Sequence, residues 1–400
     1  MDQIVRQWAW GSAVQASMPS TASDATAAAP GNWPRSQSSG WRGEARRTPP
    51  PVHVLRPPGP VARPGADRIS PATLPTMAAI KTTGPTLQVG NAVEDWTGDA
   101  RFFEYSRAAN PIGSGHTSAI PIRRCAPPDG RSSTGSHAFD LSAELQIEGR
   151  PATSPGLLAS FDVVVEGESL AVAADATSTL AYVLEGAGTF EGTWGTMEFS
   201  AGDVVASPYD AELSVSASED VLLYRVHDGP LLGYLGARPS ATRFAPVRWA
   251  AEEIRARLDA IAAEPHAGDR NRLSVLLAGA RQPTTLTATH VLWAMFGLLP
   301  EGAVQRPHRH QSVALDLIVD CQPGCYTLVG RSIDERGEIV RPERVDWEPG
   351  GAFVTPPGLW HAHVNESGSP AHLLPVQDAG LHTYLRSLNI RFAPPDRDAG

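Results

Sequence analysis

Three histidines near the C-terminal end of the sequence have a spacing suited to binding a metal ion. They lie in two segments, residues 302–310 (GAVQRPHRH) and 350–365 (GGAFVTPPGLWHAHVN). Side chains two positions apart in a β strand point to the same face, so His308 and His310 share a face. A turn at Pro356 and Gly358 can lead into a neighbouring strand that places His361 opposite this pair. Three neutral imidazoles bind Fe, Zn, Cu or Ni ions and leave coordination positions open for a substrate and oxygen.

Other polar side chains in or beside these segments are candidates for contacts with a substrate. His363 has the strand parity of His361, which makes it a candidate base. Asp316 has the parity of the paired histidines, but a straight strand at ~3.3 Å per residue would place it about 20 Å farther along. We take as catalytic candidates His363, Asp316 and Gln311, and as substrate-binding candidates Gln305, Trp360 and Asn365.

Composition restricts the class of protein. The chain has 400 residues, of which 42% are hydrophobic, enough for two ordinary domains. Its net charge of -10 argues against nucleic-acid binding, which usually needs a basic surface. No apolar run of the length needed for a membrane helix occurs, and the N-terminus lacks a secretory pattern. With 3 cysteines and no disulfide pattern, a reducing, cytoplasmic location is expected.

Turn residues and short apolar runs predict an all-β core. The 37 glycines and 36 prolines separate many short strand-like runs, which begin at about residue 155. One helix is expected at residues 249–264, where Ile254, Leu258 and Ile261 recur with a spacing of three and four. This helix separates two β-rich halves.

The same signals divide the chain into five parts. Residues 1–76 are rich in Pro, Ser and Ala, and we expect them to be disordered. Because the amino-acid composition changes at Met77, an alternative is that translation starts at this residue. The expected parts that follow are an N-terminal arm at 77–154, a first barrel at 155–240, a helical linker at 241–284 and a second barrel at 285–395.

The two histidine segments resemble the paired sequence motifs of the cupin superfamily in every spacing. The place of the glutamate that many cupins add holds Ala314. In the first half, residues 202–213 (GDVVASPYDAEL) fit the second motif, but Asp210 stands at its glycine place and Leu213 at its histidine place. The resemblance implies an all-β bicupin, with two double-stranded β-helix (jelly-roll) barrels joined by a short helix. Only the second barrel would bind metal.

The second half is similar to the gentisate 1,2-dioxygenase family beyond its histidines. The similar strings are GLLPEGAVQRPHRHQSVALDLIVD, GCYTLVG, WEPGGAFVTPPGLWHAHVN and PVQDAGLHTYLRSLNIRF. The resemblance implies a cofactor Fe²⁺, with other divalent metals as alternatives, held by three histidines without a carboxylate. It also implies a small aromatic substrate, O₂ as co-substrate and a homo-oligomer. Both oxygen atoms would enter the product as the ring opens between its hydroxyl- and carboxylate-bearing carbons.

Two departures from that family matter. Its metal usually lies in the first barrel, whereas here the motif is in the second. Asp316 occupies the place of an arginine that helps to hold the substrate, and it would repel a carboxylate. Arg309 and Arg331 are candidates for the missing positive charge, and an amino-substituted aromatic would tolerate the aspartate.

Two other functions fit the same motifs. One is a metal-dependent lyase or isomerase with His363 as base, which would not need oxygen. The other is a non-catalytic bicupin that binds a small molecule and keeps the metal for stability.

Overall fold

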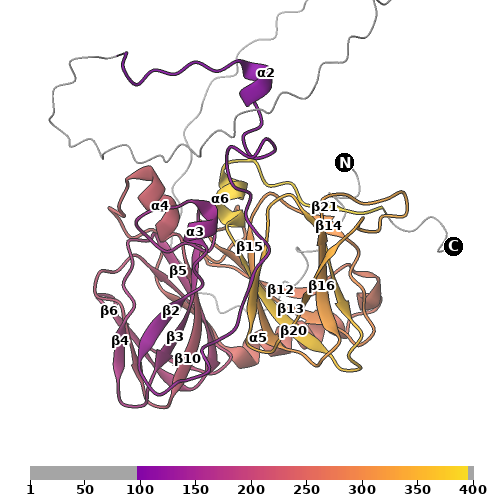
Figure 1. Cartoon of the computed structure of the whole chain (residues 1–400). Helices are drawn as coiled ribbons and strands as arrows, with labels where there is room; N and C mark the ends of the chain where they lie inside the picture. Colours follow the sequence, from indigo (N-terminus) through magenta and orange to yellow (C-terminus); the bar gives the residue numbers. More distant parts are fainter. Residues whose placement is uncertain (1–96, 395–400) are drawn as a thin grey trace, which may run out of the picture. The chain divides into compact units, whose positions relative to one another are not determined.

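The computed structural model describes residues 97–394, which form two antiparallel β barrels (Figure 1). The prediction of an all-β core is confirmed. The expected disordered extension at 1–76 and the alternative start at Met77 lie outside the described residues. Within the described residues, no helix has the length and apolar character needed to cross a membrane.

The first barrel consists of two sheets that face each other. The six-stranded sheet has the order β11-β8-β5-β10-β3-β2, and the four-stranded sheet has the order β4-β9-β6-β7. Its strands are β2 (Gly135–Ala138), β3 (Leu158–Val164), β4 (Ser169–Ala171), β5 (Ser178–Glu185), β6 (Ala187–Gly192), β7 (Gly195–Ser200), β8 (Val204–Pro208), β9 (Ser214–Ala217), β10 (Val221–His227) and β11 (Val247–Trp249). Helix α4 (Gly229–Leu235) follows β10.

The second barrel repeats this plan. Its sheets have the orders β1-β18-β15-β20-β13-β12 and β17-β16-β19-β14-β21. The strands are β1 (Arg124–Cys125), β12 (Leu273–Leu277), β13 (Trp293–Leu299), β14 (His308–Arg309), β15 (Ala314–Asp320), β16 (Cys325–Gly330), β17 (Glu343–Asp346), β18 (Ala352–Thr355), β19 (Trp360–Asn365), β20 (Ala371–Gln377) and β21 (Arg391–Phe392). Helix α6 (Ala379–Tyr384) follows β20 as α4 follows β10.

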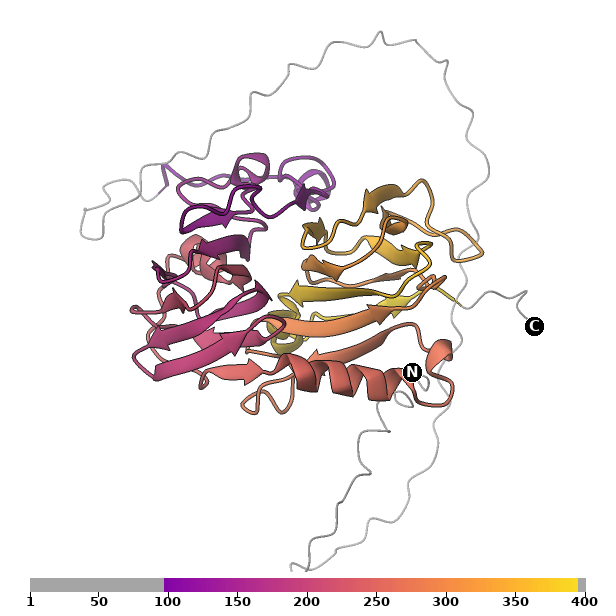
Figure 2. The same ribbon diagram turned by 90° about the horizontal axis from the view of Figure 1, so that it is seen from below.

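The predicted linker contains the expected helix and two strands. Helix α5 (Ala251–Ala262) buries Ile254 and Leu258 and packs on β12 and β13 (Figure 2). Its first amide donates to Asp203 of the first barrel at 2.8 Å, which satisfies a backbone group that the helix itself leaves unpaired. Because β11 pairs with β8 and β12 pairs with β13, the linker also extends both barrels. We therefore propose that the second barrel begins at β12.

One hydrophobic core joins the two barrels. In β10, Tyr224 and its alternate neighbours face this shared core, whereas Leu223 faces the interior of the first barrel. In β15, Leu315 and Leu317 face the shared core, and Ile318 faces the interior of the second barrel. Both faces of these strands are covered, which explains why their residues are buried without the alternation of a half-exposed strand.

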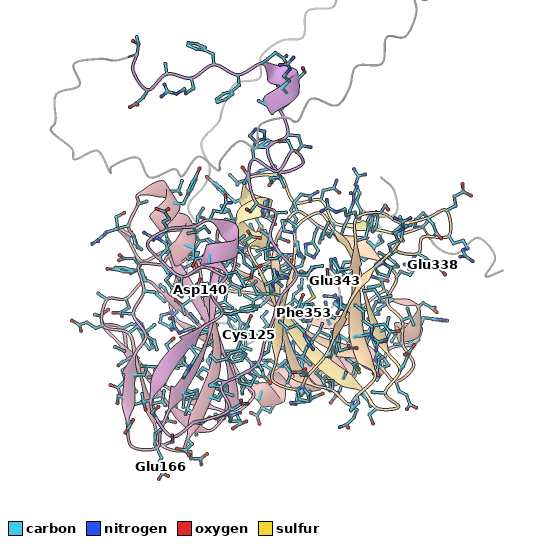
Figure 3. All side chains as sticks on the ribbon, viewed as in Figure 1. Cys125, Asp140, Glu166, Glu338, Glu343 and Phe353 are labelled. Atoms are coloured by element: carbon cyan, nitrogen blue, oxygen red, sulfur yellow. The ribbon has the colours of Figure 1, made fainter. Side chains whose placement is uncertain are left out.

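The N-terminal arm contributes a strand to each barrel. Besides its two strands it holds the short helices α2 (Tyr105–Ala108) and α3 (Ser142–Leu145). Strand β1 pairs with β18, so that Cys125 lies opposite Ala352 and Arg124 opposite Phe353. Figure 3 labels Cys125 and Phe353 of these two strands. Strand β2 pairs with β3 of the first barrel. The arm is therefore part of both sheets that meet at the shared core.

A buried ion pair connects three strands of the first barrel. Arg225 of β10 donates from Nε and Nη2 to Asp162 of β3, and the Nη2–Oδ1 distance is 3.2 Å. Ser136 of β2 also donates to Asp162. The side chains of Asp162 and Arg225 are 0% and 7% exposed, so neither charge can be compensated by water if its partner is removed.

Asp162→Asn should therefore destabilise the protein strongly, by about 3–5 kcal/mol, because it leaves Arg225 buried without its partner. Denaturant unfolding measures this free energy. The control is Arg257→Gln, which breaks the exposed pair with Glu253 on α5 and should cost less than about 0.5 kcal/mol. Equal effects of the two substitutions would contradict the assignment.

Apolar side chains fill the interior of the first barrel. Leu213, at the place of a motif histidine, is 2% exposed and packs in this cluster. Asp210, at the glycine place, accepts from the Thr193 and Glu212 amides and so stabilises a turn.

Leu213→His should consequently create no second metal site, because its barrel lacks the pair of histidines two positions apart that the second barrel has. Elemental analysis of the metal-loaded variant should give the same metal content as the wild type. A second equivalent of bound metal would contradict this reading of the first barrel.

Candidate metal centre

Strand pairing brings the three predicted histidines together. His308 in β14 lies directly opposite His361 in β19, and His310 follows β14. One ligand nitrogen from each ring lies within 4.8 Å of the others. The ring centroids of His308 and His361 are 4.1 Å apart, and those of His310 and His361 are 4.9 Å apart. All three side chains are buried, at 5%, 3% and 2% exposure.

Hydrogen bonds fix the orientation of two of these rings. His310 Nδ1 donates to the Ser312 carbonyl at 2.9 Å, and His361 Nδ1 donates to the Leu359 carbonyl at 3.1 Å. Each ring is then left with an Nε2 lone pair, the form that binds a metal. The Gly358 amide donates to the His310 carbonyl at 2.6 Å and ties the two segments together. Gly358 has φ +77°, a conformation that a side chain would strain.

The electrostatics of the three rings suit a cation. Burial lowers the pKa of His310 to about 4 and holds the pKa values of His308 and His361 well below the usual range. The rings are therefore neutral at neutral pH, as metal binding requires. His308 Nδ1 is buried without a hydrogen-bond partner. Three neutral nitrogen donors in close contact fit a divalent transition-metal ion.

His363 lies beside the three histidines on the same face of β19. Its ring centroid is 5.9 Å from that of His361, and it is 1% exposed. Its Nδ1 is 2.8 Å from Thr327 Oγ1, which also accepts from Trp347 Nε1 at 2.8 Å. These contacts fix the orientation of the His363 ring.

The guanidinium of Arg272, which was not predicted from the sequence, interacts electrostatically with the three histidines. Arg272, just before β12, donates to Met295 Sδ at 3.3 Å and to Gln305 Oε1 at 3.4 Å. No carboxylate of the described residues lies within ion-pair distance of it. Its charge contributes to the lowered pKa values of His308 and His361. The only signal in the sequence was strand alternation. In β12, Val275 and Leu277 face the shared core, so even-numbered positions, Arg272 just before the strand included, face the other way.

Asp316 also faces the interior of the second barrel. It has the parity of Ile318 in β15 and is 2% exposed. The straight strand assumed in the estimate of about 20 Å is not present, because the chain turns a corner after His310. Strand β14 belongs to one sheet and β15 to the other, which places Asp316 across the barrel from β14. Burial raises the pKa of Asp316 to about 6, although the hydrogen bond from Thr355 and the charge of Arg272 both act to lower it.

The other predicted polar residues have defined partners. Gln311 Oε1 accepts from the Asn389 amide at 2.7 Å and fixes the C-terminal segment. Asn365 donates to the Leu299 and Ser369 carbonyls, within a network at the end of β19. The substrate-binding role predicted for Asn365 gains no support from this network.

The aromatic and basic candidates do not share the face or the location of the three histidines. Trp360 has the opposite parity to His361 in β19, and Arg309 stacks on its ring at 5.0 Å. Arg331 is exposed and lines a separate groove of about 620 Å³. Phe392 of β21, which sequence reasoning missed, stacks on His308 with a centroid distance of 5.7 Å.

Comparison with known proteins gives one local sequence match. No protein-family model matches the chain. Gentisate 1,2-dioxygenase 1 of Aquipseudomonas alcaligenes is 34% identical over 82 residues. The match spans 20% of this chain and 20% of that protein.

Solved structures show the same fold over most of the described chain. Salicylate 1,2-dioxygenase from Pseudoaminobacter salicylatoxidans, in its adducts with gentisate, aligns with a TM-score of 0.55 at 13% identity, covering 72% of this chain and 90% of that one. A single-residue variant of the same enzyme aligns with a TM-score of 0.51 at 14% identity, covering 66% and 90%. The chain therefore shares the two-barrel fold of the salicylate dioxygenase structures and is similar in sequence to gentisate 1,2-dioxygenase 1 over one local stretch.

Proposed function

We propose that the protein is an iron(II)-dependent dioxygenase that opens the ring of a small hydroxylated or aminated aromatic acid. The observation that carries this proposal is the set of three buried, neutral histidines within 4.8 Å, with the Arg272 guanidinium acting on the same centre. The match to gentisate 1,2-dioxygenase 1 supports the reaction class, although it covers a minor part of either chain.

The three histidines would hold the metal. His308, His310 and His361 supply three neutral ligands, which leave the charge of a bound Fe²⁺ undiminished for anionic substrate oxygens. Bound iron would supply the means to pass electron density from the aromatic ring to O₂. The role of the protein is then to orient the ring, exclude water and keep the ligands neutral.

Arg272 is the residue best placed to bind the substrate carboxylate. Its guanidinium already donates to Gln305 but forms no ion pair among the described residues. Burial lowers its pKa, which reflects a charge poorly solvated in the absence of an anion. A carboxylate would satisfy it with charge-assisted hydrogen bonds. Gln305 would act by positioning Arg272, which gives that predicted substrate-binding residue an indirect role.

A lyase or isomerase is the second candidate function. It is favoured by His363, which is buried beside the histidines and anchored through Thr327, and so is positioned as a proton acceptor. Such a reaction would proceed without oxygen. A cytoplasmic location and a homo-oligomer stay predictions of the sequence.

Metal analysis followed by oxygen uptake tests the proposal. About one iron per chain in protein from its native host, and oxygen consumption with hydroxylated or aminated benzoates, are the expected results. Product formed at the same rate without oxygen would favour the lyase or isomerase. Zinc or nickel at that level, with no oxygen uptake, would overturn the dioxygenase assignment.

His308→Ala and His361→Ala should each abolish metal binding, because two remaining imidazoles hold a metal ion far more weakly. Elemental mass spectrometry should show the metal content falling from about one per chain to near zero. The control is His372→Ala, which removes a histidine of the same barrel that pairs with Asp320 away from the centre. Full metal occupancy in either ligand variant would refute the ligand assignment.

Arg272→Gln should raise KM for carboxylate substrates about 10–100-fold, since a hydrogen bond to a charged group contributes about 1.5–3 kcal/mol. Steady-state oxygen uptake on the iron-loaded variant measures this change. Arg331→Gln removes an equal charge from the surface of the same barrel and should leave KM unchanged. An unchanged KM in the Arg272 variant would mean that the carboxylate binds elsewhere.

A further inference from the structure

A groove of about 620 Å³ lies on the second barrel, and none of the three metal-centre histidines lines it. One wall is the segment of the N-terminal arm that leads into β1. The other is the end of β16 together with the hairpin that joins β16 to β17. Small-molecule sites in proteins have volumes of about 300–1,000 Å³, so the groove has the size of a ligand site.

Part of the groove is apolar and continuous with the interior of the second barrel. Val329 belongs to the buried cluster of this barrel, and Ile122 and Leu359 pack against that cluster. Gly330 allows the hairpin to lie close to β16, because a Cβ there would be 2.3 Å from Ile339 Cγ2. The groove therefore presents apolar surface to a ligand from Ile120, Pro121, Ile122, Val329, Val340 and Leu359.

Three arginines and one glutamate line the same groove. Arg123 is compensated, because its guanidinium donates to Glu144 of α3 at 2.7 and 3.2 Å. Arg331 and Arg341 form neither an ion pair nor a side-chain hydrogen bond within residues 97–394. Glu343, which also has no ion-pair partner in this part of the chain, offsets one of these two charges. One positive charge of the groove is therefore left without a counter-charge on the chain.

The backbone that carries one of these arginines is strained. Arg341 has φ +49°, a conformation that residues other than glycine rarely adopt. Pro342 follows it, and the residue before a proline is normally extended. Strain of this kind persists where the surrounding structure enforces it, and it concentrates at ligand-binding sites. The conformation of Arg341 thus agrees with a binding role for the groove.

We propose that this groove is a binding site for a small organic monocarboxylate with an apolar body. The carboxylate binds Arg331 and Arg341 through charge-assisted hydrogen bonds, and the apolar body covers the surface around Val329 and Leu359. One negative charge balances the one positive charge that the groove leaves uncompensated. The site adjoins the metal centre, since the Leu359 carbonyl accepts from His361 Nδ1 at 3.1 Å, but its ligand needs no metal.

Calorimetry on the metal-free, full-length protein with three ligands tests this inference. Hexanoate carries both the charge and the apolar body, whereas hexanamide has the body alone and acetate has the charge alone. Hexanoate should bind with one equivalent per chain. The other two should bind about 10-fold more weakly or worse, because each lacks one half of the match. Equal affinities for hexanoate and hexanamide would overturn the proposal.

Arg341→Gln should weaken hexanoate binding about 5-fold and leave hexanamide binding unchanged, since an ion pair with an exposed guanidinium is a modest interaction. The matched control is Arg336→Gln on the same hairpin, where Arg336 pairs with Asp334 and Glu338 and does not line the groove. This control should keep the wild-type affinity for hexanoate. Equal losses in the two variants would show a general effect of surface charge and would refute the site.

Ala119→Trp fills the groove from the side of the arm without changing its charge. Ala119 is exposed, so the larger side chain does not enter the core. Hexanoate binding should be lost while the free energy of unfolding stays unchanged, and full affinity would mean that the ligand binds elsewhere. Hexanoate bound only after metal loading would be a ligand of the metal ion and would also refute the groove. Since no step measures turnover, these outcomes are independent of the proposed function.

Discussion

The hydrophobic core shared by the two barrels is the constraint on which the candidate site depends. It covers the outer face of the sheet that contains β12, β15 and β18, where Leu315, Leu317 and Val354 are fully buried. With one face fixed in this way, strand alternation forces Asp316 and Ile318 to the other face, inside the second barrel. The histidines project from the opposite sheet. The register against the first barrel therefore decides which polar groups meet the metal ligands.

The outer face of the first barrel supplies its side of the shared core and so supports the sheet that carries Asp316. The interior of the first barrel holds apolar side chains such as Phe190, Leu213 and Leu223, and the only group of three potential metal ligands among the described residues lies in the second barrel. Its buried pair of Asp162 and Arg225 fixes the strands that form one side of the shared core. A barrel without the three-histidine group can thus remain necessary, because a change in its packing would move the strand that carries Asp316.

The sequence predicted those features that depend on residue spacing within a short segment. The histidines were found because i, i+2 parity and a turn at Gly358 specify their positions within short segments. The helix at α5 was found because Ile254 and Leu258 recur with a helical period. Asp316 was misplaced because a corner after His310, set by contacts with the distant β20, moves the chain to the other sheet. Arg272 was missed because it lies 36 positions before His308, and only sheet closure brings it near.

Charge balance gives a reason for an arginine and an aspartate in one barrel. Three neutral imidazoles leave a divalent ion with its full charge, and Arg272 and Asp316 cancel each other, so the centre carries two positive charges. Under the proposed function, a hydroxybenzoate bound through its carboxylate and its ionised hydroxyl would bring two negative charges, which would neutralise the buried site. A second carboxylate on such a substrate would leave a buried excess of negative charge.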